Sequence, residues 1–452
     1  MSLPSAEWFR PGLCADFRGG QMIGARIEFD LVLVARTALH IGSGMAVEEA
    51  VLDSSDQDVD ANVPEVAAVM RDWQDRPYIP GSSLKGCLRS HLPDACALFG
   101  DKIAEGSRSQ HRAGRMIFSD AFLEPQEEAG TRRSTRVAID PETGVALKSR
   151  LFTREIVEPG ARFALRLVCV DSPEKELVTD LATLLAVLLA ADGIALGKGT
   201  RQSMGRIAAE TNSFHARRIV PGQRSPDDVT NEWREAVGKA SAPDVKGEQV
   251  ALLLTTKSPF MISDPENAPS KGDKSTPQIV GLSEPGGGPE LTGATLLGAL
   301  RAQSAWLEAI EFPGRWDDKD FVLAKDDDPA DLTSTQRLFG VTGWRGQLSV
   351  DRIRLRNTPK KQRVTSVRID RFSAVPIDNA LYTVEAWLAP EYEIALRFHP
   401  RLAATAADDR AFFDRLITEL EDDIWGGLEL GLGKTRGFGA FAVRRLGGLA
   451  ND

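Results

Sequence analysis

The segment GSSLKGCLR at residues 81–89 recurs as GATLLGALR at residues 293–301, and each copy is followed by Leu-Phe-Gly, at residues 98–100 and 338–340. Four more segments recur in the same order: TRVAID with TSVRID (135–140, 365–370), LFTRE with LYTVE (151–155, 381–385), ALR with ALR (164–166, 395–397) and LGKGTRQSMGRI with LGLGKTRGFGAF (196–207, 430–441). The offsets between all these pairs stay between 212 and 240 residues. Unrelated matches would not keep this order, so the chain contains two copies of one domain.

The repeats divide the chain into an N-terminal extension (1–28), a first domain (29–215), a linker (216–248) with a short helix at 229–239, and a second domain (249–452). Each copy opens with a Val- and Leu-rich strand and continues through a long loop to a helix. We expect Ser82, Ser83 and Thr295 to cap these helices. The order strand–helix–strand–strand–helix–strand predicts an α+β fold made of two tandem ferredoxin-like (RRM-like) domains.

Composition narrows the function classes. Hydrophobic residues make up 42% and charged residues 27% of the 452, which is typical of a folded chain. We expect a cytoplasmic protein, because there is no secretion-like N-terminus, no run of about 18–20 apolar residues and no C-x-x-C pair among four scattered cysteines. The net charge of -10 argues against a non-specific nucleic-acid binder. Residues 351–371, however, hold eight basic side chains against two acidic ones.

Two Gly-rich loops close the two copies. GLGKT at residues 431–435 is superficially a phosphate-binding Walker A loop, but Leu428 stands where that motif needs Gly, and Asp192 does so in the first copy, which excludes an NTPase. Glycines permit close backbone approach, so the loops can face phosphates, although a tight helix-to-strand turn is the alternative explanation. The candidate phosphate-binding residues here are Gly197, Lys198, Gly199, Arg201, Gly431, Gly433, Lys434 and Arg436.

The helix after the long loop offers a second phosphate site. Lys85 and Arg89 lie four residues apart and share a face near a helix start, together with Ser82 and Ser83. Exposed basic residues on a helix are also commonly just solvated. In the second copy Arg301 keeps the place of Arg89 while the place of Lys85 is taken by a leucine, so we expect a weaker site there.

Three segments carry a family resemblance: LHIGSG at residues 39–44, RPYIPGSSLKGCLRS at 76–90 and the LGKGTRQSMGRI loop. They resemble the RAMP superfamily of CRISPR-associated proteins, in particular the backbone subunits of type III effector complexes. The second copy resembles the family more loosely, through SPFMISD at 258–264 and GPELTGATLLGALR at 288–301. A tandem fusion of two such domains is similar to the fused backbone subunits of some type III variants.

The resemblance implies a subunit that lines up with RAMP-family neighbours and other subunits of the complex along a CRISPR RNA. Each domain would hold one short segment and push a β-hairpin thumb through the guide–target duplex. The thumbs would fall within residues 132–154 and 360–382. They contribute the candidate RNA-binding residues Arg133, Arg136, Arg368 and Arg371.

The resemblance also implies cleavage of target RNA by an aspartate of the loop after the first strand, with Mg²⁺ or another divalent metal. In the first copy Glu65 stands nearest to that position, with Asp58 and Asp60 upstream; the second copy offers Asp264 and Asp273. A carboxylate can orient a hydrated Mg²⁺ beside a displaced nucleotide. Keeping a loop solvated is the alternative role.

Three functions therefore stay open. The first is a backbone subunit that binds the guide and cleaves the target, and the second is a scaffold subunit that binds the guide without cutting. The third is a metal-independent nuclease that processes CRISPR RNA with His40 as general base. Met261 takes the place of His40 in the second copy, which favours a packing role for His40. The other four histidines form no metal-ligand spacing.

Overall fold

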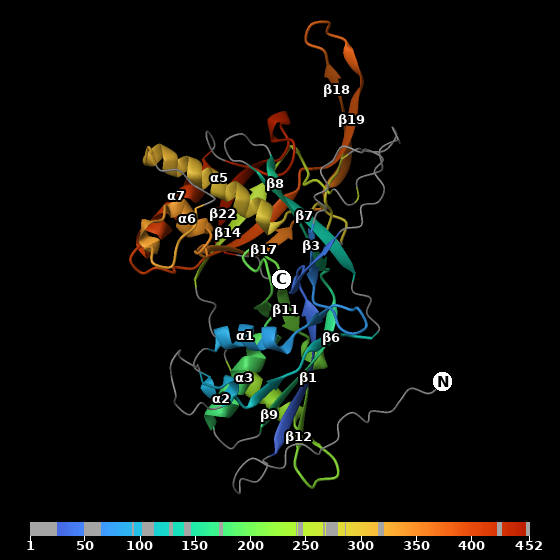
Figure 1. The fold of residues 1–452 in the computed structure, drawn as a ribbon, viewed down its shortest axis with the longest axis vertical. Coiled ribbons are helices and arrows are strands. Elements are labelled where there is room, and N and C mark those ends of the chain that lie inside the picture. The colour runs from blue at the N-terminus through green and yellow to red at the C-terminus, as the bar shows by residue number, and fades with distance from the viewer. Residues whose placement is uncertain are drawn as a thin grey trace, which may run out of the picture.

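A computed structural model describes residues 25–48, 65–92, 95–101, 113–125, 130–139, 146–170, 175–240, 242, 247–264, 267, 279–284, 286–314, 321–422 and 427–448. Two domains follow one another, each with its own main sheet and hydrophobic core. The main sheet of the first lies in the lower half of Figure 1 and that of the second in the upper half, into which β7 (Thr131–Ile139) and β8 (Ala146–Val157) of the first domain extend. Within the described residues, no helix combines the length and apolar character that crossing a membrane requires.

The first domain is organised around β1 (Arg26–Ala35), in which alternate residues are buried. β1 pairs antiparallel with β9 (Arg162–Val170) on one side, and with β11 (Arg206–Ala209) and β12 (His215–Ile219) on the other. The sheet is completed by β4 (Tyr78–Ile79), β5 (Met116–Phe118), β6 (Ala121–Leu123), β10 (Ile194–Ala195) and β13 (Asp227–Asp228). The helices of this half are α1 (Gly81–His91), α2 (Cys96–Phe99), α3 (Lys175–Leu189), η1 (Thr211–Ser213) and α4 (Thr230–Lys239).

The second domain repeats this plan. Its sheet runs β17 (Leu348–Leu355), β20 (Glu391–Phe398), β14 (Glu248–Thr255), β22 (Ala440–Leu446) and β21 (Leu428–Glu429). Its helices are α5 (Gly293–Glu311), η2 (Pro329–Asp331), α6 (Ser334–Phe339), α7 (Ala406–Glu421) and η3 (Lys434–Arg436). If the main-sheet strands are numbered in chain order, they are β1, β5–β6, β9 and β11 in the first domain and β14, β17, β20 and β22 in the second. In both sheets the order of neighbours is then fourth, first, third, second. This mixed helix and strand structure agrees with the predicted α+β class.

The sheet registers correct one repeat match. Leu31 pairs with Leu165 in the first domain, and its counterpart Leu252 pairs with Ile394 in the second. Leu165 therefore corresponds to Ile394 and not to Leu396, so the match of the two ALR segments is wrong by two residues. A shift of two residues leaves every side chain on the same face of the sheet, and the hydrophobic pattern therefore could not reveal it.

Each domain carries a long antiparallel hairpin in the range predicted for it. The hairpins are β7 (Thr131–Ile139) with β8 (Ala146–Val157), and β18 (Lys360–Ile369) with β19 (Pro376–Leu388). Thr135 and Thr153 share a hydroxyl hydrogen bond of 2.9 Å, and Thr365 and Thr383 repeat it at 3.0 Å. Figure 1 shows β18 and β19 standing out from the body of the second domain.

Short strands of the long loops brace these hairpins at the same place in both domains. β3 (Glu65–Val69) pairs in parallel with β8, and β16 (Ile279–Val280) pairs in parallel with β19. The remaining loop strands are β2 (Gly42–Glu48), which pairs with β3, and β15 (Pro259–Phe260), which pairs with β19. The end of the first strand, the long loop and the hairpin therefore meet at one locus in each copy.

Two local expectations are revised. The N-cap of α1 is Pro80, without a side-chain cap, and the Gly81 amide donates instead to the Asp120 carboxylate at 2.8 Å. The cap of α5 is the Thr292 hydroxyl, which accepts from the Thr295 amide. The expected caps Ser82, Ser83 and Thr295 were wrong, because all three lie within the first helical turns.

The segment expected to be a linker packs onto the first domain. Residues 216–240 contribute β12, β13 and α4. Trp233 of α4 is 4% exposed and stands edge-on to Phe29, with ring centroids 5.1 Å apart. Phe214 stacks on Phe29 from the same side, so this stretch extends the first core.

Candidate nucleic-acid interface

The two Gly-rich loops have the same backbone. Gly197 and Gly431 have φ of +84° and +81°, and a Cβ on either would lie 2.3 or 2.2 Å from a carbonyl oxygen at the end of the first strand. Only glycine fits such a position. The next amide in each loop, of Lys198 or Leu432, donates to the same carbonyl at 2.9 Å. These two hydrogen bonds hold each loop against the segment that follows the first strand.

Lys198 in the first loop, and Lys434 and Arg436 in the second, project exposed side chains as predicted. The first loop nevertheless differs from the second, because its residues 201–206 contact the other domain. Gln202 forms a parallel bridge to Val350 of β17.

Arg201 is the centre of this contact. Its Nε donates to the Leu348 carbonyl at 2.8 Å, and its Nη1 donates to the Phe339 carbonyl at 3.0 Å. A Cβ on Gly346 would lie 2.5 Å from Nη2, so the absence of a side chain there makes room for the guanidinium. Burial lowers the pKa of Arg201 to about 10, with neighbouring arginines adding to the effect. The geometry favours an interdomain role for Arg201 over the predicted contact with RNA.

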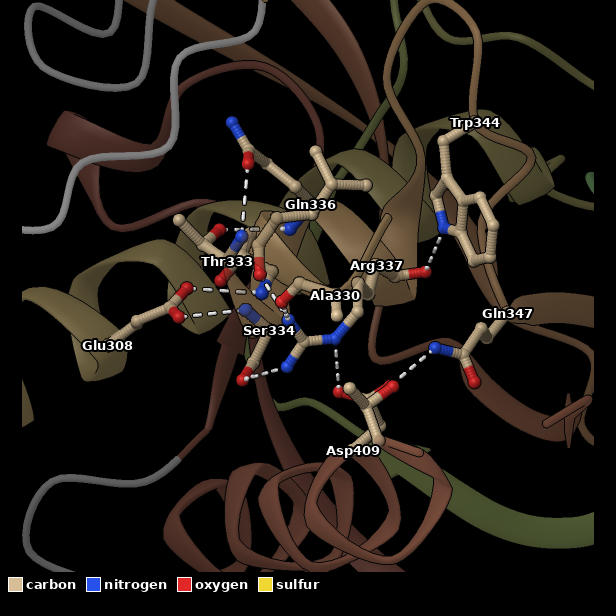
Figure 2. A network of polar contacts seen from close by, with 12 residues as sticks. Glu308, Ala330, Thr333, Ser334, Gln336, Arg337, Trp344, Gln347 and Asp409 are labelled. Carbon is tan, nitrogen blue, oxygen red and sulfur yellow. Dashed lines mark hydrogen bonds and ion pairs between the residues drawn. The ribbon is translucent and has the colours of Figure 1, made fainter. Parts of the chain in front are cut away.

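The carbonyl oxygens of Leu348 and Phe339 thus form a socket for Arg201. A buried polar network supports the α6 end of this socket (Figure 2). Arg337 donates from Nε to Asp409 at 2.8 Å, and Gln347 donates to the other oxygen of the same carboxylate at 2.6 Å. Glu308 accepts from the first two amides of α6, those of Ser334 and Thr335, at 2.8 and 3.0 Å. Because α6 ends at Phe339, the network fixes the turn whose carbonyl oxygens receive Arg201.

Arg89 and Arg301 make equivalent hydrogen bonds in the two copies. Arg89 donates to the Gly100 carbonyl at 2.8 Å and Arg301 donates to the Gly340 carbonyl at 2.7 Å. Lys85 is half-buried beside Arg89, with Ser82 exposed and Ser83 half-buried. The candidate site on α1 therefore keeps Ser82, Ser83 and Lys85 toward the surface, while Arg89 holds the Leu-Phe-Gly turn.

The first hairpin also reaches the second domain, a contact that the sequence did not indicate. Arg132 of β7 donates to the Glu290 carboxylate at 2.8 Å. Arg136 donates to the side chain of Gln202 at 2.7 Å, and burial lowers its pKa to about 10. Burial raises the pKa of Glu290, against the opposing effect of Arg132 and Arg136. This half-buried junction of unlike charges was missed because Arg132 and Glu290 lie 158 residues apart in the sequence.

The second hairpin presents its cations to solvent. Arg363, Arg368 and Arg371 are exposed, and Phe372 at the tip is 100% exposed. Arg133 of the first hairpin is also exposed. Clustered exposed cations with an aromatic side chain are suited to a polyanion with flat bases.

The five candidate carboxylates are only partly described. Asp58, Asp60 and Asp273 lie outside the described residues, and Glu65 begins β3 with its side chain outside them. Asp264 is 7% exposed, and Asn267 donates to its carboxylate at 2.7 Å. Over the part of the chain that the structure describes, no three His, Cys, Asp or Glu side chains form a group that could hold a metal ion. Asp264, the one candidate whose side chain is described, does not by itself make up a Mg²⁺ site.

His40 is fully buried at the end of β1. Its Nδ1 lies 2.6 Å from the Glu155 carbonyl, which only accepts, so Nδ1 carries the proton of the neutral ring. Nε2 has no partner among the described residues, and a Cβ on Gly42 would lie 3.1 Å from Nε2 and 3.6 Å from Nζ of Lys198. Burial lowers the pKa of His40, with Arg154 and Lys198 acting in the same direction. This closed environment suits the packing role that Met261 indicated.

The comparison with known families gives one finding for the whole chain. A family model described as RAMP superfamily matches residues 32–208 and again residues 253–442. A search of the curated proteins finds no match. The two matched regions coincide with the two β1- and β14-centred domains and exclude most of the stretch between them. Membership indicates a CRISPR-associated role in RNA binding. The chain thus belongs to the RAMP superfamily, and it contains the RAMP domain twice.

Proposed function

We propose that the chain is a backbone subunit of a type III CRISPR interference complex that binds the CRISPR RNA and cleaves complementary target RNA. One observation carries the proposal: in both RAMP domains a Gly-rich loop, the end of the first strand and a long hairpin meet at the same place. A duplicated site of this kind suits a ligand that repeats, such as successive segments of one RNA strand.

The fold supports this proposal in finer detail. The strand order fourth, first, third, second in both sheets, with helices after the first and third strands, supports a ferredoxin-like fold for each domain. We infer that β7–β8 and β18–β19 are the thumbs, and that their exposed arginines contact RNA. RAMP-family subunits and other subunits of the complex would be the protein neighbours.

Cleavage is the second element of the proposal. The loop after β14 brings Asp264 to the junction with the first hairpin, where Glu290 contacts Arg132. Asp58, Asp60, Glu65 and Asp273 remain candidates, with Mg²⁺ or another divalent metal as the proposed cofactor. A scaffold that binds the guide without cutting is the alternative. His40 as a processing base is disfavoured by its closed environment.

The test is target cleavage by the complete complex, assembled on a defined guide and given end-labelled complementary RNA with Mg²⁺. Asp264→Asn, Asp273→Asn and the pair Asp60→Asn with Glu65→Gln are compared with wild type, and Asp326→Asn, on an exposed turn, is the control. Loss of a specific band in one variant assigns that cut to one domain. Unchanged bands in all variants, or no cleavage by wild type, leave a scaffold subunit.

A further inference from the structure

The two domains differ in chemistry at the locus where their backbones agree best. In the second domain, Tyr382 of β19 meets Arg436 and Phe438 of the Gly-rich loop. The corresponding residues of the first domain are Phe152, Gln202 and Met204, by the repeat matches LFTRE with LYTVE and LGKGTRQSMGRI with LGLGKTRGFGAF. One side of the duplication therefore carries a cation between two aromatic rings, and the other does not.

The geometry of the second-domain cluster is that of a stacked cation. The guanidinium carbon of Arg436 lies 5.3 Å from the centroid of the Tyr382 ring and 6.0 Å from that of Phe438. Nη1 of Arg436 also donates to the Tyr382 hydroxyl. The distances are within the range of cation–π attraction, so the three side chains hold one another in place.

The cluster lies at the surface on a rigid base. Met261, Val384 and Ala386 are buried beneath it, and both Tyr382 and Phe438 pack on these residues. Arg436 is exposed and the two rings are partly exposed. The aromatic and guanidinium planes are thus presented to solvent while their orientation is fixed from below.

The same locus of the first domain is more polar, and it holds a single exposed ring, Phe152, with the guanidinium carbon of Arg154 5.2 Å from the ring centroid. Arg136 donates to Gln202 there, and residues 201–206 are covered by the second domain. His40 corresponds to Met261 of the second domain. Lys198 corresponds to Leu432, which is 38% exposed. The first locus is therefore suited to attract phosphate, and the second to hold a flat apolar group.

We propose that Tyr382, Arg436 and Phe438 form a stacking site for an unpaired nucleobase, which the first domain lacks. Every base has a π-face that stacks on aromatic rings and on guanidinium planes without regard to sequence. Lys434, exposed two residues before Arg436, provides a cation for the adjoining phosphate. An apolar peptide segment is a poorer occupant, because it would remove the Arg436 guanidinium from water without supplying a counter-charge. The proposal rests on the RNA-binding function proposed above.

Binding of the full chain to fluorescein-labelled single-stranded polyuridylate, measured by anisotropy over a range of NaCl concentrations, tests the proposal. We expect Tyr382→Leu and Phe438→Leu to weaken binding about tenfold at every salt concentration, because stacking is not an ionic contact. Tyr382→Phe keeps the ring and retains most of the affinity. Trp306→Leu removes an exposed aromatic side chain of α5 and is the control that leaves affinity unchanged, whereas Lys198→Ala lowers the salt dependence.

A second readout needs no variant. RNA containing 5-iodouridine, irradiated in complex with the wild-type chain, is expected to cross-link to peptides that contain Tyr382 or Phe438, and mass spectrometry identifies them. Wild-type RNA binding with unchanged affinity in both leucine variants, or cross-links confined to other peptides, overturns the stacking site and leaves the proposed function intact. No RNA binding by wild type overturns both.

Discussion

At the scale of single residues, the two copies place different side chains on the same backbone conformation. The carbonyl of His40 accepts from the Lys198 amide, and the carbonyl of Met261 accepts from the Leu432 amide at the same distance of 2.9 Å. Burial disfavours the charged form of His40 and lowers its pKa, whereas Met261 has no ionisable group. The residue found in one copy is thus a substitution that tests the role of its counterpart in the other copy.

His40→Met makes the first test, through the pH dependence of stability. The folded pKa of His40 lies below the unfolded value of about 6.5, so the folded state binds fewer protons there. The contribution of neutral His40 is complete above that value and is lost as pH falls below it toward the folded pKa. We expect the free energy of unfolding of wild type to fall between pH 7 and pH 5, and that of His40→Met to fall less, by urea denaturation.

If the two proteins show parallel curves, His40 does not titrate in this manner. The same variant separates the processing hypothesis from the packing role. A general base cannot be replaced by a thioether, so retained processing of repeat RNA by His40→Met excludes His40 as that base.

Arg201→Thr makes the second test, since threonine is the residue that the second loop carries at this place. It leaves the carbonyls of Leu348 and Phe339 without the donors they have now. We expect the free energy of unfolding to fall by about 3 kcal/mol, because buried hydrogen bonds to a charged group are lost. The reverse change Thr435→Arg lies on an exposed loop and should stay within about 0.5 kcal/mol of wild type. Equal effects of the two variants in chemical denaturation would contradict the socket.

At the scale of elements, the hairpins differ in their attachment. β7–β8 is tied to the second domain through Arg132, whereas the outer part of β18–β19 projects from the body (Figure 1). The exposed side chains Val367, Ile369 and Phe372 of the second hairpin contribute nothing to the cores. The outer part of this hairpin is therefore suited to act on a ligand, and we expect it to be dispensable for folding.

Shortening the second hairpin tests this. Residues 368–380 are replaced by Asn-Gly, which turns directly from Val367 to Leu381, a pair in the register. We expect the free energy of unfolding to stay within about 0.5 kcal/mol of wild type, since no core residue is removed. Affinity for guide RNA or the spacing of cleavage bands should change. A large loss of stability would show that the tip packs in the fold.

The sequence predicted these elements better than their contacts. The two hairpins overlap the ranges that the family resemblance implied, and the glycines at 197 and 431 share the left-handed backbone that their repeat implied. Contacts such as Arg201 with the Leu348 carbonyl are invisible to a repeat, because they join unlike surfaces of the two copies. Trp233 was unpredictable for a similar reason: a Pro-, Gly- and charge-rich stretch resembles a linker even when one aromatic side chain anchors it.

At the scale of the whole molecule, Asp351 joins the two domains. Its carboxylate lies 3.2 Å from Nη2 of Arg206 in the first domain, and accepts at 2.6 Å from Nε of Arg397 in the second. The Arg206 Nε also donates to the Asp351 carbonyl. With Arg201 in its socket, this contact makes the stability of each domain depend on the other.

Asp351→Asn should weaken that dependence. Removing one charge of a largely buried ion pair leaves Arg206 and Arg397 uncompensated, at a cost of about 3 kcal/mol. In scanning calorimetry we expect the unfolding transitions of the two domains to move apart. Asp227→Asn, on an exposed strand, serves as the control. Identical calorimetric profiles for wild type and Asp351→Asn would mean that the domains unfold independently already.

The burial of one Gly-rich loop and the exposure of the other have an evolutionary consequence. In an assembly of identical separate chains, every subunit has the same loop sequence. Each loop residue must then suit contact with both the neighbouring subunit and the ligand. Covalent duplication removes that constraint, because the order of the two halves is fixed in the gene. The first loop was then free to evolve toward contact with the second domain, through Arg201, while the second loop kept Arg436 exposed. Selection on such a chain acts on two specialised sites instead of one compromise.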